Sequence, residues 1–378
     1  MKKSRDRRLV VKVGTNTLVD QSGQLDPIFM AALVSQLAAL TNDGYDVALV
    51  SSGAVRAGMA ALGIDSLRSL RESQAAAAVG QGRLMHIYHE LFEVHRLAVA
   101  QILLISHDFE FRKRYLNARN TLSTLFEHKI VPIINENDTV SVEEIKFGDN
   151  DGLASQVAGL IDAGILMFLS DIDGLHARDG EKLGAKIDVV EKVTPDIQAL
   201  AGYSVGKYSR GGMVSKVANA KIATEGGTRV YIAKGREQNV IPRLLSGEPL
   251  GTVFYPQTGW RDSRKRWIGM SGAVAGTLVV DGGASEVLVH GNKSLLPAGV
   301  VAVEGHFQAG DVVRIVGADR NEVGRGLTNY SSEEIARIRG VHSSQVEAIL
   351  GYHGDQEIIH RDNMFTFKAL REDGHERK

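Results

Sequence analysis

The chain has 378 residues, enough for about two domains of ~150 residues each. Its 44 lysines and arginines balance 45 aspartates and glutamates, so the net charge of −1 does not indicate a protein that binds polyanions through bulk charge. The absence of cysteine excludes disulfides, thiolate metal sites and cysteine nucleophiles. Only a short apolar run precedes Lys12, and no run of about 18 apolar residues is present. We therefore expect a cytoplasmic protein without a membrane span.

The first two-thirds of the chain alternate short apolar runs with helical patterns. These runs are nearly continuous, which is typical of strands buried on both faces of a parallel sheet. The predicted strands are residues 9–14, 45–51, 99–105, 129–135, 165–170 and 228–233. The alternation of strand and helix predicts an α/β fold with a doubly wound, mostly parallel sheet.

The first long helix is predicted to begin at Asp26 and Pro27, because aspartate caps helices and proline suits the first helical position. Its apolar side chains are expected to face a core: Ile28, Leu33, Leu37 and Leu40. Further helices are predicted over residues 74–97 and 113–128.

After residue 258 the alternation of strand and helix patterns ends. We expect a first domain over 1–258, a linker over 259–274, a second domain over 275–354 and a tail over 355–378. Short runs broken by glycine predict that the second domain is a small β-barrel or sandwich: 276–283, 286–291, 299–305 and 311–317. A short helix is predicted over 331–340, with Ser331 or Ser332 as its cap.

Ligands of open α/β sheets bind beyond the carboxyl ends of the strands, so the loops there are the places where a site is expected. Lys12 and Gly14 stand at the end of the first run. Lys12 could bind an anion there, with Gly14 letting backbone N–H groups approach it, or Lys12 could simply lie on an edge strand and reach solvent. The turn with Ser52 suits anion capture at a helix N-terminus, although it could be an ordinary turn. Polar residues also follow later strands, in 135–141 and 170–174.

Two further stretches place polar residues where a helix starts. In "FGDNDGLAS" (147–155), one of Asp149, Asn150 and Asp151 could serve as a helix cap, which leaves the other two unexplained. In "SRGGMVSKVANAK" (209–221), a Gly-Gly loop enters a helix that carries Lys216 in its first turn. Lysines, small anion-binding loops and a group of Asp and Asn residues together fit phosphoryl transfer, which requires positioning and charge neutralisation.

Other chemistries have little support in the sequence. "GGMVSK" lacks the glycine spacing and the Lys-Ser/Thr pair of a Walker A loop, and no G-x-G-x-x-G follows a strand. A nicotinamide-dependent oxidoreductase is therefore disfavoured. The twelve histidines show no metal-binding spacing.

Six stretches together resemble one branch of a known family: "VVKVGTNTL", "VSSGAVRAG", "QAAAAVGQGRLM", "LNARNTL", "PIINENDTVSVEEIKFGDND" and "GGMVSK". The chain resembles the amino-acid kinase family, in particular its bacterial glutamate 5-kinase branch, over nearly its whole length. Residues 275–354 resemble a PUA domain. The resemblance implies ATP-dependent phosphorylation of the γ-carboxylate of L-glutamate, the first step toward proline. It also implies Mg²⁺ carried by the ATP phosphates, feedback inhibition by L-proline and a homo-oligomer, a dimer or tetramer.

The resemblance implies roles for individual residues. The catalytic group would be Lys12 and Lys216, which contact the transferring phosphoryl group, and Asp151, which orients the two lysines. Glutamate would be bound by Ser52, Asp138 and Asn150, with Asp149 shaping its pocket. The nucleotide would be held by Lys12, Ser170, Asp171, Arg210, Gly211, Gly212, Met213, Val214, Ser215 and Lys216. No protein ligand for a metal is implied. Arg210 and Ser170 both stand where the family usually has threonine.

Two alternatives follow from the same residues. A related amino-acid kinase could act on N-acetylglutamate or aspartate, although "NEND" with "GDND" argues against it. The PUA-like segment could instead bind RNA. It carries 6 Lys+Arg against 9 Asp+Glu, which is not the electrostatic signature of a nucleic-acid-binding surface.

Overall fold

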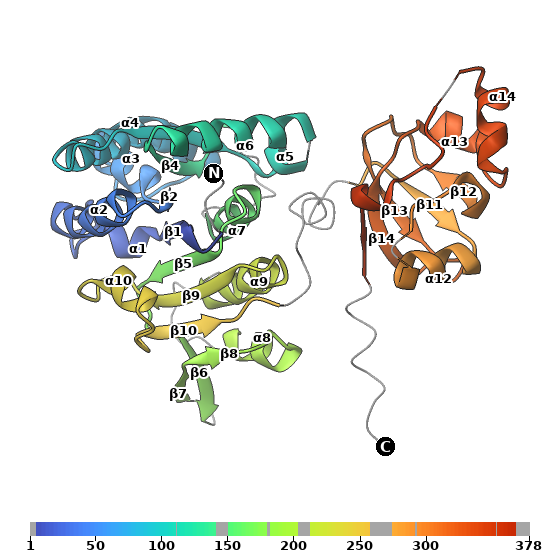
Figure 1. Ribbon diagram of the computed structural model, residues 1–378. Coiled ribbons are helices and arrows are strands. Elements are labelled where there is room, and N and C mark those ends of the chain that lie inside the picture. The colour runs from blue at the N-terminus through green and yellow to red at the C-terminus, as the bar shows by residue number, and fades with distance from the viewer. Residues whose placement is uncertain are drawn as a thin grey trace. The chain divides into compact units, whose positions relative to one another are not determined.

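The computed structural model describes residues 5–110, 112–140, 150–179, 182–202, 212–257, 274–291, 293–352 and 354–367. Two compact units make up the chain, one formed mainly by residues up to Gly259 and the other mainly by residues from Trp260 onward (Figure 1). The predicted domain, linker and tail limits stay predictions. No helix in the described ranges has the length and apolarity that crossing a membrane requires.

An eight-stranded sheet organises the larger unit. In the order of the sheet its strands are β3 (Val99–Leu104), β4 (Val131–Glu136), β2 (Asp46–Ser51), β1 (Arg8–Val13), β5 (Ile165–Ser170), β9 (Arg229–Lys234), β10 (Gly251–Phe254) and β8 (Val189–Val190). The first six of these are the six strands that the apolar runs predict, and they pair in parallel. Only β10 runs antiparallel to its neighbour β9. The mostly parallel α/β sheet is therefore confirmed.

Helices connect and cover these strands. They are α1 (Thr15–Leu18), α2 (Pro27–Asn42), α3 (Ala54–Leu62), α4 (Leu70–Glu93), α5 (Ser106–Glu110), α6 (Arg112–Glu127), α7 (Asn150–Leu160), α8 (Pro195–Ala201), α9 (Gly212–Glu225) and α10 (Val240–Leu245). A 3-10 turn η1 (Arg5–Arg7) precedes β1, and a separate hairpin is formed by β6 (Leu175–Asp179) and β7 (Lys182–Ile187).

The start of α2 follows the predicted capping chemistry. The Asp26 carboxylate accepts hydrogen bonds from the backbone N–H groups of Ile28 and Phe29 at 3.1 Å, and Pro27 fills the first helical position. Leu33 and Leu37 are buried as expected, but Ile28 is 84% exposed, so its predicted core position is wrong. At 100° per residue Ile28 lies about 140° around the helix from Leu33, on the solvent side.

The two faces of β1 have different neighbours. Leu9, Val11 and Val13 pack into the core that α2 and α4 cover. Side chains alternate along a strand, so Lys12 points to the opposite face. There it meets α7, which places a charged group inside the unit rather than in solvent.

The smaller unit is built on a five-stranded sheet of order β12 (Val300–Glu304), β11 (Gly276–Val280), β13 (Val312–Val316), β14 (Glu322–Leu327) and β15 (Met364–Thr366). Its pairs are antiparallel except for β11 with β13. The short helices are α12 (Gly282–Gly291), α13 (Ser332–Ile338) and α14 (Val346–Leu350), with 3-10 turns η2 (Pro297–Gly299), η3 (Ser343–Gln345) and η4 (Arg361–Asn363).

One predicted strand of this unit is a helix. Residues 286–291 lie in α12, which begins where the Asp281 carboxylate accepts the backbone N–H of Ala284 at 2.7 Å. The aspartate cap therefore prevails over the β-branched run "EVLV". The helix predicted after Ser331 is confirmed, and Ser331 and Glu334 form a reciprocal capping box.

Candidate active site

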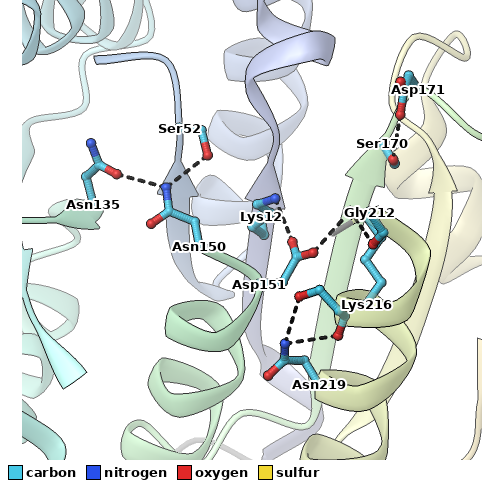
Figure 2. Close-up of polar contacts among 11 residues, drawn as sticks. Lys12, Ser52, Asn135, Asn150, Asp151, Ser170, Asp171, Gly212, Lys216 and Asn219 are labelled. Atoms are coloured by element: carbon cyan, nitrogen blue, oxygen red, sulfur yellow. Dashed lines mark hydrogen bonds and ion pairs between the residues drawn. The ribbon is translucent and has the colours of Figure 1, made fainter. Parts of the chain in front are cut away.

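Adjacent strands bring the predicted polar residues to one edge of the sheet. The strands β4, β2, β1 and β5 are consecutive neighbours and run parallel, so their carboxyl ends coincide. Asn135, Lys12 and Ser170 lie at the ends of β4, β1 and β5, and Ser52 follows β2 directly. Figure 2 shows that α7 enters the same place with Asn150.

Asp151 joins two buried lysines (Figure 2). Its Oδ1 lies 2.6 Å from Lys12 Nζ, and its Oδ2 accepts a hydrogen bond from Lys216 Nζ at 3.1 Å. Lys216 also donates to the Gly212 carbonyl at 3.3 Å, which ties its ammonium to the start of α9. All three charged side chains are buried. The strand β1 lies between β2 and β5, so the alternative of a lysine on an edge strand is wrong.

The carboxyl group of Asp151 stays ionised. Burial alone would raise its pKa, but the Lys12 and Lys216 ammonium groups hold the pKa below the ordinary value for aspartate. Two lysines and one carboxylate leave an excess positive charge in a buried place. Since an isolated buried charge is costly, the cluster is suited to receive an anion such as a phosphate.

A second group of side chains, next to the lysine cluster, is neutral. The Asn150 amide Nδ2 donates to Ser52 Oγ and to Asn135 Oδ1, both at 2.9 Å. The Asn135 amide Nδ2 donates in turn to Gln81 Oε1 at 2.9 Å. Two buried atoms at the ends of this chain, Asn150 Oδ1 and Gln81 Nε2, have no hydrogen-bond partner within the described part of the protein. The Asn150 oxygen, at the end nearest the lysine cluster, is thus left as an acceptor for a ligand.

Asp138 follows β4, two residues after Glu136. Burial raises the pKa of its carboxyl to about 6, and the neighbouring Glu136 carboxylate adds to the shift. A cationic ligand would stabilise the charged form of this half-buried carboxylate, because its positive charge counteracts the effects of burial and of the Glu136 carboxylate.

Comparison with known proteins identifies this arrangement. The description "Amino acid kinase family" matches residues 7–234, and "PUA domain" matches residues 276–350. The chain belongs to the amino acid kinase family.

Relatives place the chain among the glutamate 5-kinases of this family. A protein named "Glutamate 5-kinase" from Caldanaerobacter subterraneus subsp. tengcongensis is 46% identical over 96% of this chain and 98% of its own length. Another of that name, from Herpetosiphon aurantiacus, is 47% identical over 95% of this chain and 98% of its own length.

A solved structure is similar in fold alone. It is the N-acetylglutamate synthase from Neisseria gonorrhoeae complexed with coenzyme A and N-acetyl-glutamate, with a TM-score of 0.50 and 15% sequence identity. The likeness covers 67% of this chain and 60% of that chain.

The described residues that are predicted to hold the nucleotide lie at the ends of β1 and β5 and in the first turns of α9. The Ser170 hydroxyl donates to Asp171 Oδ1 at 3.0 Å, and the Asn16 amide reaches Asp171 Oδ2 at 3.5 Å. The α9 helix begins at Gly212, its Met213 is buried and its Val214 is half-exposed. Of the predicted site residues, Asp149, Arg210 and Gly211 lie outside the described residues.

The structure adds site residues that the sequence alone did not single out. Asn135 and Gln81 extend the hydrogen-bonded amide group around Asn150, and both lie in stretches that resemble the family. Asn219 donates to the backbone oxygen of Ser215 at 3.0 Å and to its hydroxyl at 3.2 Å, which fixes the first turns of α9. The sequence did offer one indication that Asn135 belongs to a site, because it comes directly after an apolar run. Gln81 had no local signal, because it lies inside a helix.

Proposed function

We propose that this chain transfers the γ-phosphoryl group of ATP to the γ-carboxylate of L-glutamate, giving L-glutamyl 5-phosphate, the first step of proline biosynthesis. The relatives named glutamate 5-kinase, 45–47% identical over nearly the whole chain, support this reaction. The observation that carries it in the structure is the buried Lys12–Asp151–Lys216 cluster beside a neutral amide group.

The reaction needs charge neutralisation more than proton transfer. The γ-carboxylate is ionised at neutral pH, with a usual pKa of about 4.3, so its oxygen can attack without a general base. A bond forms between that oxygen and the γ-phosphorus while the bond to the bridging oxygen of ADP breaks. Lys12 and Lys216 would stabilise the charge on the moving phosphoryl group, and Asp151 would hold both ammonium groups in place.

The nucleotide would lie on the α9 side of the cluster. Its phosphates would meet the first turn of α9, where Gly212 to Lys216 lie, and Ser170 and Asp171 would contact the rest of the molecule. The Mg²⁺ that accompanies ATP would neutralise phosphate charge. The phosphates themselves would supply much of its coordination.

Glutamate would bind on the amide side. Its α-ammonium would face the Asp138 carboxylate and Asn150 Oδ1, both of which can accept hydrogen bonds. Ser52, at the turn into α3, would complete this pocket together with Asp149. An ammonium suits these acceptors better than an N-acetyl group does, which favours glutamate over N-acetylglutamate.

The assay that tests the reaction traps its product. ATP consumption should depend on L-glutamate, and hydroxylamine should convert the acyl phosphate to a hydroxamate. N-Acetylglutamate and L-aspartate should give far less hydroxamate at equal concentration. A chain that prefers either of these two acids would contradict the proposal.

The pH dependence of glutamate use should follow Asp138. Because its pKa is raised to about 6, the carboxyl loses its charge as the pH falls through that value, and its attraction for the α-ammonium is lost. We expect kcat/KM for glutamate, which reports the free enzyme, to fall below about pH 6. The kcat profile should fall only at lower pH, since a bound ammonium favours the charged carboxylate. An Asp138→Asn variant should have a lower but flatter kcat/KM profile, and an unchanged fall in this variant would assign the titration to another group.

L-Proline should inhibit competitively with glutamate. It has the same α-carboxylate and a cationic nitrogen, so the groups that hold the head of glutamate can accept it. It has no γ-carboxylate to phosphorylate. Raising the glutamate concentration should abolish the inhibition. Thermodynamic linkage requires each ligand to lower the affinity for the other by the same factor. Initial rates at several concentrations of both compounds test this, and a non-competitive pattern would place proline at a separate site.

Two further properties belong to the proposal. We infer a homo-oligomer, a dimer or tetramer, which size-exclusion chromatography with light scattering can measure. We also infer action in the cytoplasm, where ATP is available. A role of the PUA domain in RNA binding is not favoured, because its charge is net negative.

A further inference from the structure

The amide groups of Gln81, Asn135 and Asn150 form a relay with a defined direction. Asn150 donates to Asn135, and Asn135 donates to Gln81, so each amide oxygen inside the relay accepts from the next amide nitrogen. A backbone group fixes this direction: the N–H of Glu136 donates to Asn135 Oδ1 at 2.9 Å. Since a backbone N–H can only donate, Asn135 must keep its oxygen on that side.

This direction determines what Asn150 offers to a substrate. Both protons of its amide nitrogen are used, one by Ser52 and one by Asn135. Its oxygen is therefore the atom left over, and that oxygen is buried without a partner in the described ranges. If the amide were reversed, the pocket would present a donor, which would repel an ammonium instead of accepting its proton.

Gln81 holds the far end of the relay. It lies in α4, is 91% buried, and its Oε1 is the acceptor for Asn135. The neighbouring Gly80 brings it there: a Cβ at this position would lie 1.8 Å from the Ala54 carbonyl oxygen, so only glycine lets α4 approach the start of α3 this closely. The close approach brings this part of α4 to the start of α3, two residues after Ser52.

We propose that Gln81 is a positioning residue of the substrate site, which selects substrates with a free α-ammonium by fixing the orientation of Asn150 through Asn135. The inference rests on the proposed glutamate kinase function. Removing Gln81 Oε1 would leave the Asn135 amide nitrogen buried without its acceptor. The Asn135 amide would then be held through its oxygen alone, by the Glu136 N–H, and its plane could turn about that bond. The acceptor for Asn150 Nδ2 would shift with it, and Asn150 Oδ1 would be held less firmly toward the ammonium.

The test compares two ligands that differ only in the amino group. Glutarate has both carboxylates of glutamate but no α-ammonium, so it should inhibit weakly. The ratio of its inhibition constant to the KM for glutamate measures the recognition of the ammonium. In Gln81→Met this ratio should fall about 10-fold, the effect of losing a hydrogen bond to a charged group. The KM for ATP should stay unchanged.

Two further variants separate positioning from packing. Gln81→Glu keeps an oxygen that can accept from Asn135, so it should restore most of the ratio. Gln36→Met makes the same substitution in α2, where the amide oxygen accepts the backbone N–H of Ile241 at 3.0 Å, and it should leave the ratio unchanged. If Gln81→Met does not fold, Gln81→Leu, which also removes the acceptor oxygen, replaces it with the same expected fall in the ratio.

Three outcomes would overturn the proposal. An unchanged ratio in Gln81→Met would show that Asn150 needs no support from Gln81. An equal fall in Gln36→Met would attribute the effect to packing. If Gln81→Glu weakened the binding of glutamate and of glutarate equally, the Gln81 amide nitrogen would be a direct ligand of the substrate instead of a positioning group. These results differ from failure of the proposed function, in which the unaltered chain forms no glutamyl hydroxamate.

Discussion

Replacing Lys216 by alanine should lower kcat about 100–1000-fold, the usual effect of removing one group that meets charge developing in a transition state. The Lys216 ammonium is buried and fixed by Asp151 Oδ2 and the Gly212 carbonyl, so its removal takes away a positive charge held in place, which a neutral water does not replace. The KM for glutamate should change much less, because the proposed glutamate pocket lies on the amide side, around Asn150. Steady-state kinetics with both substrates measure the changes in kcat and in KM separately.

The matched control for this variant is Lys221→Ala, on the same helix but outside the cluster. Its kcat should stay close to that of the unaltered chain. Lys216→Ala should also remain folded, since Asp151 keeps Lys12 as a partner at 2.6 Å. A near-normal kcat in a folded Lys216→Ala protein would remove this lysine from the chemistry.

Replacing Asp151 by asparagine should both abolish turnover and destabilise the fold. The two ammonium groups would face each other in a buried place without the carboxylate that pairs them. Breaking a buried ion pair by removing one partner costs about 3–5 kcal/mol, and we expect a loss of that order in the free energy of unfolding. The pKa of Asp151 is lowered, so its carboxyl is fully charged at pH 7 and denaturant unfolding there reports the whole effect.

Two comparisons sharpen this expectation. Asp162 also lies near two cations, Arg5 at 2.9 Å and Arg8 at 4.0 Å, but its side chain is 30% exposed, so Asp162→Asn should cost less than about 1 kcal/mol. ATP should raise the melting temperature of Asp151→Asn more than that of the unaltered chain, because phosphate would supply the missing negative charge. Equal stability of the two aspartate variants would show that the lysines do not need the carboxylate.

The sequence by itself determined the six parallel strands of the larger unit and the polar residue types that follow them. Runs such as 165–170 and 228–233 are mostly apolar, which is typical of strands buried on both faces, and they pair in parallel inside the sheet. Caps such as Asp26 and Ser331 are local signals, since the cap and the N–H groups that it accepts lie within three residues. The motifs that resemble the family lie in the same short stretches.

The tertiary structure alone decided which side chains meet. Asp151 joins lysines from β1 and α9, and Asn150 reaches Ser52, which lies 98 positions earlier. Gln81 carries no sign of its role, because a polar residue inside a helix reads as surface until the neighbouring helix is placed. The local pattern was misleading at residues 286–291, which were predicted as a strand but lie in α12, a helix capped by Asp281. Local structure follows from interactions within a few residues, whereas a site depends on strand order and helix packing, which bring together residues far apart in the chain.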